Sequence, residues 1–193
     1  MTILDHCALQ TVGNQEFDVI LTSERTSRNK DSKTYKTMRL LEMDEKFIDP
    51  IDEFIETWKN KAPMQNLVIS IGDGGNEFGM GKLENKFCTA VDSCDFLIGA
   101  GVSNWACYAL CIAIQNLYND DDCHRYVNQG LTGNREKVSG FLDFGVCRDH
   151  LMAHEKQGIR DGCKPDQLVS VDGMLFDQEH KCFIEKLNAK FVV

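Results

Sequence analysis

"LVISIGDGGNEFGMG", residues 67–81, begins as an apolar run and ends as a glycine-rich stretch. The run from Leu67 to Ile71 shows no alternation of apolar and polar residues, which predicts a strand buried on both faces. Five glycines follow within residues 70–81, together with two carboxylates and one amide. Since loops after the carboxyl ends of strands carry ligand sites in α/β sheets, this stretch predicts both the fold class and the place of the chemistry.

The rest of the chain supports the same fold class. Apolar runs over residues 17–22 and 96–100 predict two more strands, and Asp49-Pro50 predicts a helix start with Asp49 as N-cap. Ser103 is expected to cap a helix over 104–118, another helix is expected over 146–157, and Asp172-Gly173 predicts a hairpin turn before a last helix. We therefore expect one α/β domain over 1–193: a layered, mostly parallel sheet flanked by helices, with a C-terminal hairpin and helix.

Composition narrows the classes of partner. The net charge of −9 disfavours nucleic acid, and no stretch of about eighteen apolar residues predicts a membrane span. The basic cluster from Arg25 to Lys36 is interrupted by Asp31 and is expected to be a solvated loop. Nine cysteines without a CxxC pair indicate free thiols in a reducing compartment.

Known phosphate-binding fingerprints do not fit the glycine stretch. Glu77 stands where GxGxxG needs its third glycine, and Gly81-Lys82 is followed by Leu83 instead of Ser or Thr. What remains is Asp73, Asn76 and Glu77, whose hard oxygen atoms suit Mn²⁺ or Mg²⁺. A tight turn whose acids cap the next helix is the alternative, and the spacing alone leaves both open.

Five segments, in this order, resemble the C-terminal domain family of D-glutamate cyclase over about residues 16–190: FDVILTSERTSRN, FIDPIDEFI, IGDGGNEFGMGKL, AGVSNWACYAL and SVDGMLFDQEH. The resemblance implies an enzyme that converts D-glutamate to 5-oxo-D-proline with loss of water. It implies a mitochondrial location for animal members, the cytoplasm being the other expectation, and its metal-dependent microbial relatives fit the oxygen-ligand interpretation.

The sequence differs from the family pattern in one respect. Members of the family begin upstream of this chain, with further strands and a Thr-Asp-Gly-Pro stretch that this sequence lacks. We therefore expect a domain that starts partway, an exposed sheet edge, self-association and weak cyclase activity. A metal-dependent phosphatase on the same loop and a non-catalytic homologue are the alternative functions.

Cyclisation of glutamate sets the expected roles. A base must take a proton from the ammonium group, and the side-chain carboxyl must be activated for attack by the amine. Glu24 and Asp73 are the expected bases because each follows a strand-like run, and Arg25 could hold the substrate α-carboxylate. The complete set of predicted site residues is Glu24, Asp73 and Glu77 for catalysis, Arg25, Gly74, Gly75 and Asn104 for substrate, and Asp73, Asn76 and Glu77 for metal.

Overall fold

The computed structural model describes residues 18–84, 86–119 and 142–191. The chain divides into two compact units, 1–106 and 107–193. A single domain can contain two such units, so one domain over 1–193 stays a prediction. In the described ranges no helix is both long and apolar enough to cross a membrane.

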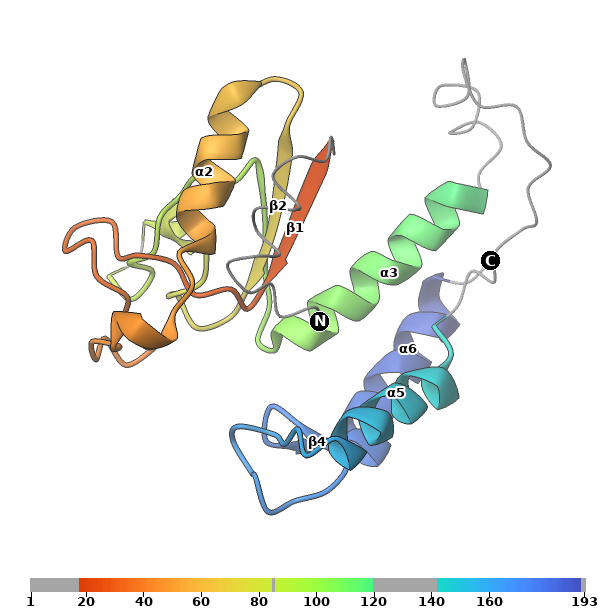
Figure 1. Cartoon of the computed structure of the whole chain (residues 1–193). Helices are drawn as coiled ribbons and strands as arrows, with labels where there is room; N and C mark the ends of the chain where they lie inside the picture. The colour runs from red at the N-terminus through yellow and green to blue at the C-terminus, as the bar shows by residue number, and fades with distance from the viewer. Residues whose placement is uncertain (1–17, 85, 120–141, 192–193) are drawn as a thin grey trace. The chain divides into compact units, whose positions relative to one another are not determined.

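The first unit is built on a parallel sheet in the order β1-β2-β3 (Figure 1). The strands are β1 (Val19–Ser23), β2 (Leu67–Gly72) and β3 (Phe96–Gly99), all close to the predicted runs. Ser23 pairs with Ile71, and Gly72 pairs with Gly99, so the carboxyl ends of the three strands lie at one edge. The α/β prediction is confirmed.

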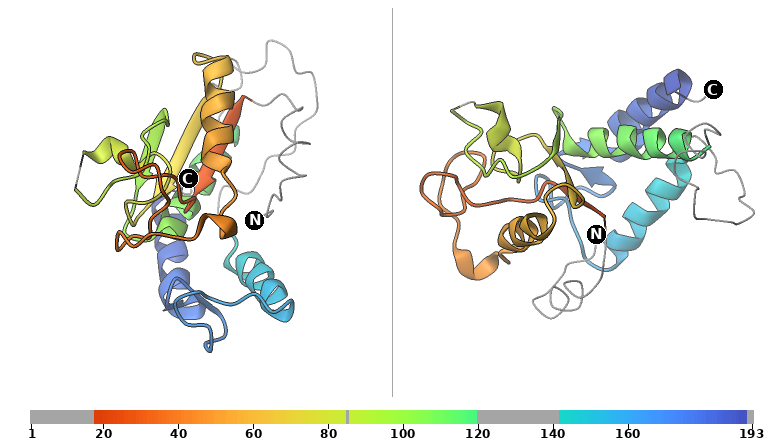
Figure 2. Two further views of the ribbon diagram at one scale, coloured as in Figure 1. Left: turned by 60° about the vertical axis from the view of Figure 1, so that its left-hand side comes forward. Right: turned by 90° about the horizontal axis from the view of Figure 1, so that it is seen from above.

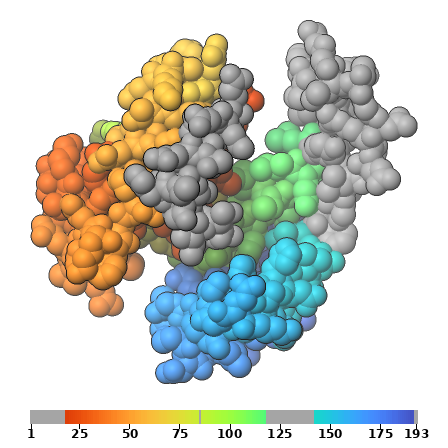
Figure 3. Space-filling view, in the orientation of Figure 1, coloured from red at the N-terminus to blue at the C-terminus, as the bar shows by residue number. Residues whose placement is uncertain are grey.

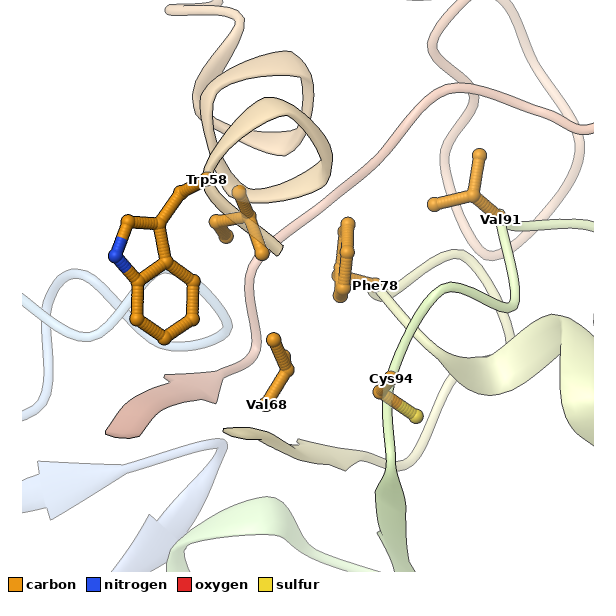
Figure 4. Packing of buried hydrophobic residues seen from close by; sticks show 6 residues of the cluster. Trp58, Val68, Phe78, Val91 and Cys94 are labelled. Atoms are coloured by element: carbon orange, nitrogen blue, oxygen red, sulfur yellow. The ribbon is translucent and has the colours of Figure 1, made fainter. Parts of the chain in front are cut away.

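Helix α2 (Ile51–Lys61) connects β1 to β2 and runs alongside both strands in two views (Figures 1 and 2). Its inner side packs Ile55 and Trp58 against Val68 of β2, in a core that also includes Phe78, Val91 and Cys94 (Figure 4). The outer side of α2 lies at the surface of the first unit (Figure 3). Burial of these large apolar side chains is the main force that holds the helix on the sheet.

The start of α2 differs by one residue from the prediction. The N-cap position is Pro50, without a side-chain cap, and the N–H of Ile51 donates to the main-chain carbonyl of Asp49 at 2.8 Å. Asp52, an acid in the first turn of α2, is completely buried. The short helix η1 (Glu45–Phe47) precedes this turn.

Close approach of another backbone segment explains two of the five glycines between 70 and 81. A Cβ atom at Gly75 would lie 2.4 Å from the carbonyl oxygen of Phe87, and one at Gly81 would lie 2.1 Å from that of Ala90. Gly75 and Gly79 also have positive φ angles of 92° and 86°. The stretch then passes through the 3₁₀ helix η2 (Met80–Leu83). Bare backbone at Gly75 and Gly81 is therefore needed for packing against the backbone of residues 87–91.

Helix α3 (Ser103–Asn119) begins in the first unit and continues into the second. The second unit also contains α5 (Phe144–Lys156), the antiparallel pair β4 (Ser170–Val171) and β5 (Met174–Leu175), the π-helical turn η3 (Phe176–His180) and α6 (Lys181–Phe191). The hairpin turn at Asp172 and Gly173 has φ angles of 53° and 76°, which confirms the predicted turn. The predicted C-terminal hairpin and helix are both present.

Candidate active site

The carboxyl-terminal edge of the sheet gathers the predicted acids. Glu24 directly follows β1, and its N–H donates to the carbonyl of Ile71 at 3.1 Å. Asp73 directly follows β2, and the N–H of Ala100, after β3, donates to the carbonyl of Gly72 at 3.2 Å. Glu24 is exposed and has a φ angle of 51°, whereas Asp73 is half-buried. Both acids therefore start the loops where ligand sites form in parallel sheets.

Glu77 folds back on its own loop. Its carboxylate accepts hydrogen bonds from the N–H of Gly75 at 2.8 Å and from the N–H of Gly74 at 3.1 Å, and the residue is only 6% exposed. Burial raises the pKa of this carboxyl, and the nearby Asp73 raises it further, against the lowering effect of the hydrogen bonds. The two glycine N–H groups predicted to bind substrate are therefore engaged by Glu77 in this structure.

Asn76 lies beside the same carboxylate. Its Nδ2 donates to the carbonyl of Lys36 at 3.0 Å. A Cβ atom at Gly74 would lie 2.9 Å from Oε1 of Glu77 and 3.1 Å from Oδ1 of Asn76. These two side-chain oxygen atoms therefore both lie close to the Cα atom of Gly74. Over the described ranges no three His, Cys, Asp or Glu side chains are grouped as a metal site. The chemistry of this donor pair nevertheless fits a hard divalent cation.

Asp73 joins the glycine loop to the start of α3. Its Oδ2 accepts a hydrogen bond from the N–H of Ser103 at 3.0 Å. The prediction that Ser103 caps this helix is wrong: α3 begins at Ser103, whose Oγ makes no hydrogen bond to any described residue. The helix start therefore receives its anion from Asp73, which matches the positive end of the helix dipole.

Two more predicted residues carry polar atoms whose bonding is incomplete. Oδ1 of Asn104 is buried and has no hydrogen-bond partner in the part of the chain described here. The same holds for Nε of Arg25, whose Nη2 donates to the main-chain carbonyl of Asp49. Buried polar atoms are nearly always paired, so each of these atoms is a candidate contact for water or a bound ligand.

Backbone contacts hold the segment after β1 against the glycine loop. The N–H of Phe78 donates to the carbonyl of Arg25 at 2.8 Å, and the N–H of Ser27 donates to that of Asn76 at 3.1 Å. These bonds bring the region of Glu24 and Arg25 next to the loop that carries Asn76 and Glu77. Most of the predicted site residues are thus parts of one local structure.

Sequence reasoning missed an ionic network beside this structure. Oδ2 of Asp52 accepts from the main-chain N–H and from Nε of Arg28, at 3.0 and 2.8 Å, and Oδ1 accepts from the hydroxyl of Tyr35 at 2.6 Å. Residues 25–36 are therefore not the expected solvated loop, since Ser27, Asn29 and Tyr35 are buried. No periodic or spacing signal in the sequence links Arg28 to Asp52.

Comparisons with known proteins identify the family of the chain. A family model described as "D-glutamate cyclase-like, C-terminal" matches residues 2–188. The human protein "D-glutamate cyclase, mitochondrial" is 28% identical over 187 residues, which cover 89% of this chain and 29% of that relative. The chain thus spans less than a third of the length of that relative. Because the family model matches nearly the whole sequence, the chain belongs to the D-glutamate cyclase-like C-terminal family.

Proposed function

We propose that this chain acts as a D-glutamate cyclase-like hydro-lyase that converts D-glutamate to 5-oxo-D-proline and water. The observation that carries the proposal is the family match over residues 2–188. The sheet edge with Asp73, Glu77 and Arg25 supplies the types of group that the reaction needs. The name of the human relative further suggests a mitochondrial location for this chain.

The reaction joins two ends of one small molecule. The substrate amine, after loss of a proton, attacks the side-chain carboxyl carbon, a C–N bond forms, and one carboxyl oxygen leaves as water. A pocket that holds the substrate in a bent conformation makes this attack effectively unimolecular. The site must therefore bind the α-carboxylate, hold the ammonium group beside a base and activate the side-chain carboxyl.

Three residues are assigned to the first two tasks. Arg25 would hold the α-carboxylate, which is supported by the buried Nε that lacks a partner among the described residues. Glu24 and Asp73 are the candidate bases, and the half-buried Asp73 is the better enclosed of the two. Gly74 and Gly75 would contribute N–H groups to substrate binding only if Glu77 shared or released them.

A divalent cation, Mn²⁺ or Mg²⁺, is proposed to complete the site. Asn76 and Glu77 would hold it through the oxygen pair beside Gly74, with Asp73 from the same loop. When bound, such an ion polarises a carboxylate and offsets its charge. Titration calorimetry with MnCl₂ should detect binding to the wild type and its loss in Glu77→Ala and Asp73→Ala. Equal binding by all three proteins would refute the assignment.

The deciding experiment measures 5-oxoproline formed from D-glutamate by the purified chain, with Mn²⁺ and with EDTA. L-Glutamate controls for stereochemistry, and p-nitrophenyl phosphate tests for phosphatase activity on the same loop. We expect 5-oxoproline from D-glutamate and a large loss of it in Asp73→Asn. Phosphate release without 5-oxoproline, or no turnover of either compound, would reject the cyclase assignment.

A further inference from the structure

The turn over residues 37–41 lies against the glycine loop, and its Met38 has no assigned role. A Cβ atom at Gly74 would lie 3.1 Å from the Cβ atom of Met38. The side-chain oxygen atoms of Glu77 and Asn76 lie 2.9 and 3.1 Å from the same point. Gly74 is half-buried and Met38 is 63% exposed, so solvent reaches this part of the loop. One accessible point is therefore bordered by two acceptor oxygen atoms and by an apolar side chain.

Hydrogen bonds of Thr37 hold the backbone that carries Met38. Oγ1 of Thr37 accepts from the N–H groups of Arg39 and Leu41 at 3.3 and 3.2 Å. The N–H of Thr37 donates to the carbonyl of Leu41 at 2.9 Å, which closes the turn. The carbonyl of the residue before Thr37 accepts from Nδ2 of Asn76 at 3.0 Å, so the turn is tied to the glycine loop itself. The position of Met38 beside the loop is therefore fixed by printed backbone and side-chain contacts on both sides of it.

An apolar side chain beside acceptor oxygen atoms suits one kind of ligand. A dicarboxylic amino acid carries charged groups at both ends and only methylene groups between its α-carbon and its side-chain carboxylate. Methionine has an unbranched, polarisable side chain that adapts its shape to such groups. Covering an exposed Met38 with an alkyl chain is favourable roughly in proportion to the apolar area removed from water. The polar and apolar sides of this point thus match the end and the middle of the same small molecule.

We propose that Met38 is a specificity-determining residue of the candidate active site, which packs on the carbon chain of an acidic amino acid and limits its length. The identity of the ligand rests on the proposed function, which makes it D-glutamate. A ligand with one more methylene group would have to displace Met38 or withdraw one charged group from its partner. Thr37 is a positioning residue, because it acts on the ligand only through Met38.

Two ligands that differ by one methylene group test this role. D-Glutamate and D-2-aminoadipate carry the same charged groups, so the ratio of their dissociation constants isolates the effect of chain length. Titration calorimetry with MnCl₂ present should show the wild type binding D-glutamate at least about tenfold tighter, as is usual for discrimination by one methylene group. Met38→Ala removes the side chain beyond Cβ and should reduce that ratio at least about fivefold, mainly through tighter binding of D-2-aminoadipate.

Three further variants separate chain length from a general loosening of the loop. Met38→Leu keeps an apolar side chain of similar volume and should retain the ratio. Thr37→Val keeps the shape of the side chain but removes the acceptor Oγ1, and should lower the ratio in the same direction as Met38→Ala. Met64→Ala is the matched control, because Met64 follows α2 and is 92% exposed, and it should leave the ratio unchanged. Thermal melting confirms that each variant is folded before the titrations are compared.

The outcomes separate the role of Met38 from the proposed function. An unchanged ratio in Met38→Ala, an equal change in Met64→Ala, or no binding of D-glutamate by the wild type would each overturn the role of Met38. A lowered ratio in Met38→Ala supports it even if the wild type forms no 5-oxoproline, in which case only the cyclase assignment fails. Formation of 5-oxoproline together with an unchanged ratio would leave the cyclase assignment standing and reject Met38 as the residue that limits chain length.

Discussion

The hydroxyl of Tyr35 donates a 2.6 Å hydrogen bond to Oδ1 of Asp52, a carboxylate that is completely buried on α2. Arg28 donates to the other oxygen through its main-chain N–H and its Nε. One carboxylate on a helix thus holds two points of the segment that follows β1. Because the same segment carries Glu24 and Arg25, this contact fixes one side of the candidate active site.

Removal of the Asp52 carboxylate should therefore destabilise the first unit. We expect Asp52→Ala to lower the free energy of unfolding by about 3 kcal/mol, because Arg28 and Tyr35 lose their buried partner. Tyr35→Phe should cost about 1.5 kcal/mol, the value for one bond to a charged group. Urea denaturation followed by circular dichroism measures both.

Glu53→Ala is the matched control for the Asp52 variant. Glu53 also binds Arg28, at 3.0 Å from Nη1, but its side chain is 55% exposed. Exposed ion pairs contribute little, so we expect a loss below about 1 kcal/mol. A cost as large as that of Asp52→Ala would show that general charge balance, and not the buried contact, holds this segment.

The glycine loop yields a prediction about backbone contact. In Gly81→Ala the new methyl group would meet the main-chain carbonyl of Ala90 at 2.1 Å, and backbone atoms cannot give way cheaply. We expect a loss of at least about 2 kcal/mol in the free energy of unfolding. Gly101→Ala is the control, because no atom lies within 4 Å of its new Cβ, and its effect should stay within about 0.5 kcal/mol.

Two buried serines should respond differently to the same change. Ser70 and Ser103 are both 0% exposed, but within the described residues only the hydroxyl of Ser70 has a hydrogen-bond partner, the hydroxyl of Thr22 at 3.0 Å. Ser70→Ala should cost about 1–2 kcal/mol because Thr22 loses a buried partner. Ser103→Ala should be neutral or stabilising, since it removes a buried hydroxyl that has no hydrogen-bond partner among the described residues. Thermal melts without ligand measure the difference, and an equal loss in both variants would indicate a missing partner for Ser103 within the protein.

Local patterns in the sequence were sufficient for the elements but not for the contacts between them. The apolar run before Gly72 and the Asp172-Gly173 turn each depend on a few neighbouring residues, and both were predicted correctly. The bond between Asp73 and Ser103 joins residues 30 positions apart, so the sequence suggested a serine cap where the structure uses an aspartate. The ion pair between Arg28 and Asp52 was not predicted for the same reason. The composition of residues 25–36 shows a basic segment, but it does not show which buried acid that segment contacts.

For the candidate site, too, the sequence predicted the position but not the contacts within it. Its position after β1 and β2 followed from the rule for parallel sheets, and the structure places Glu24 and Asp73 at that edge. The engagement of Gly74 and Gly75 by Glu77 depends on the fold of the loop back on itself, which residue types alone do not specify. Roles in catalysis and metal binding stay predictions for the experiments above.

The last prediction concerns pH and the buried His180 in the second unit. Its Nε2 lies 3.1 Å from the carbonyl of Val171, which can only accept, so Nε2 carries the proton and Nδ1 accepts from the hydroxyl of Tyr108 at 3.1 Å. The ring also stacks on Phe176 with a centroid distance of 5.3 Å. Burial lowers the pKa of His180 below its ordinary value of 6.5, against the raising effect of the Val171 carbonyl and of Asp172, Glu179 and Asp161.

Because this pKa is lower in the folded protein, the unfolded chain binds the proton first as the pH falls. The stability contribution of a neutral His180 is therefore complete above about pH 6.5 and is lost as the pH decreases toward the folded pKa. We expect the free energy of unfolding to fall between pH 7.5 and pH 5 by more in the wild type than in His180→Gln. His150→Gln, at an exposed position of α5, removes a histidine without this burial and serves as the control. Parallel pH profiles for the wild type and His180→Gln would show that His180 does not titrate differently on folding.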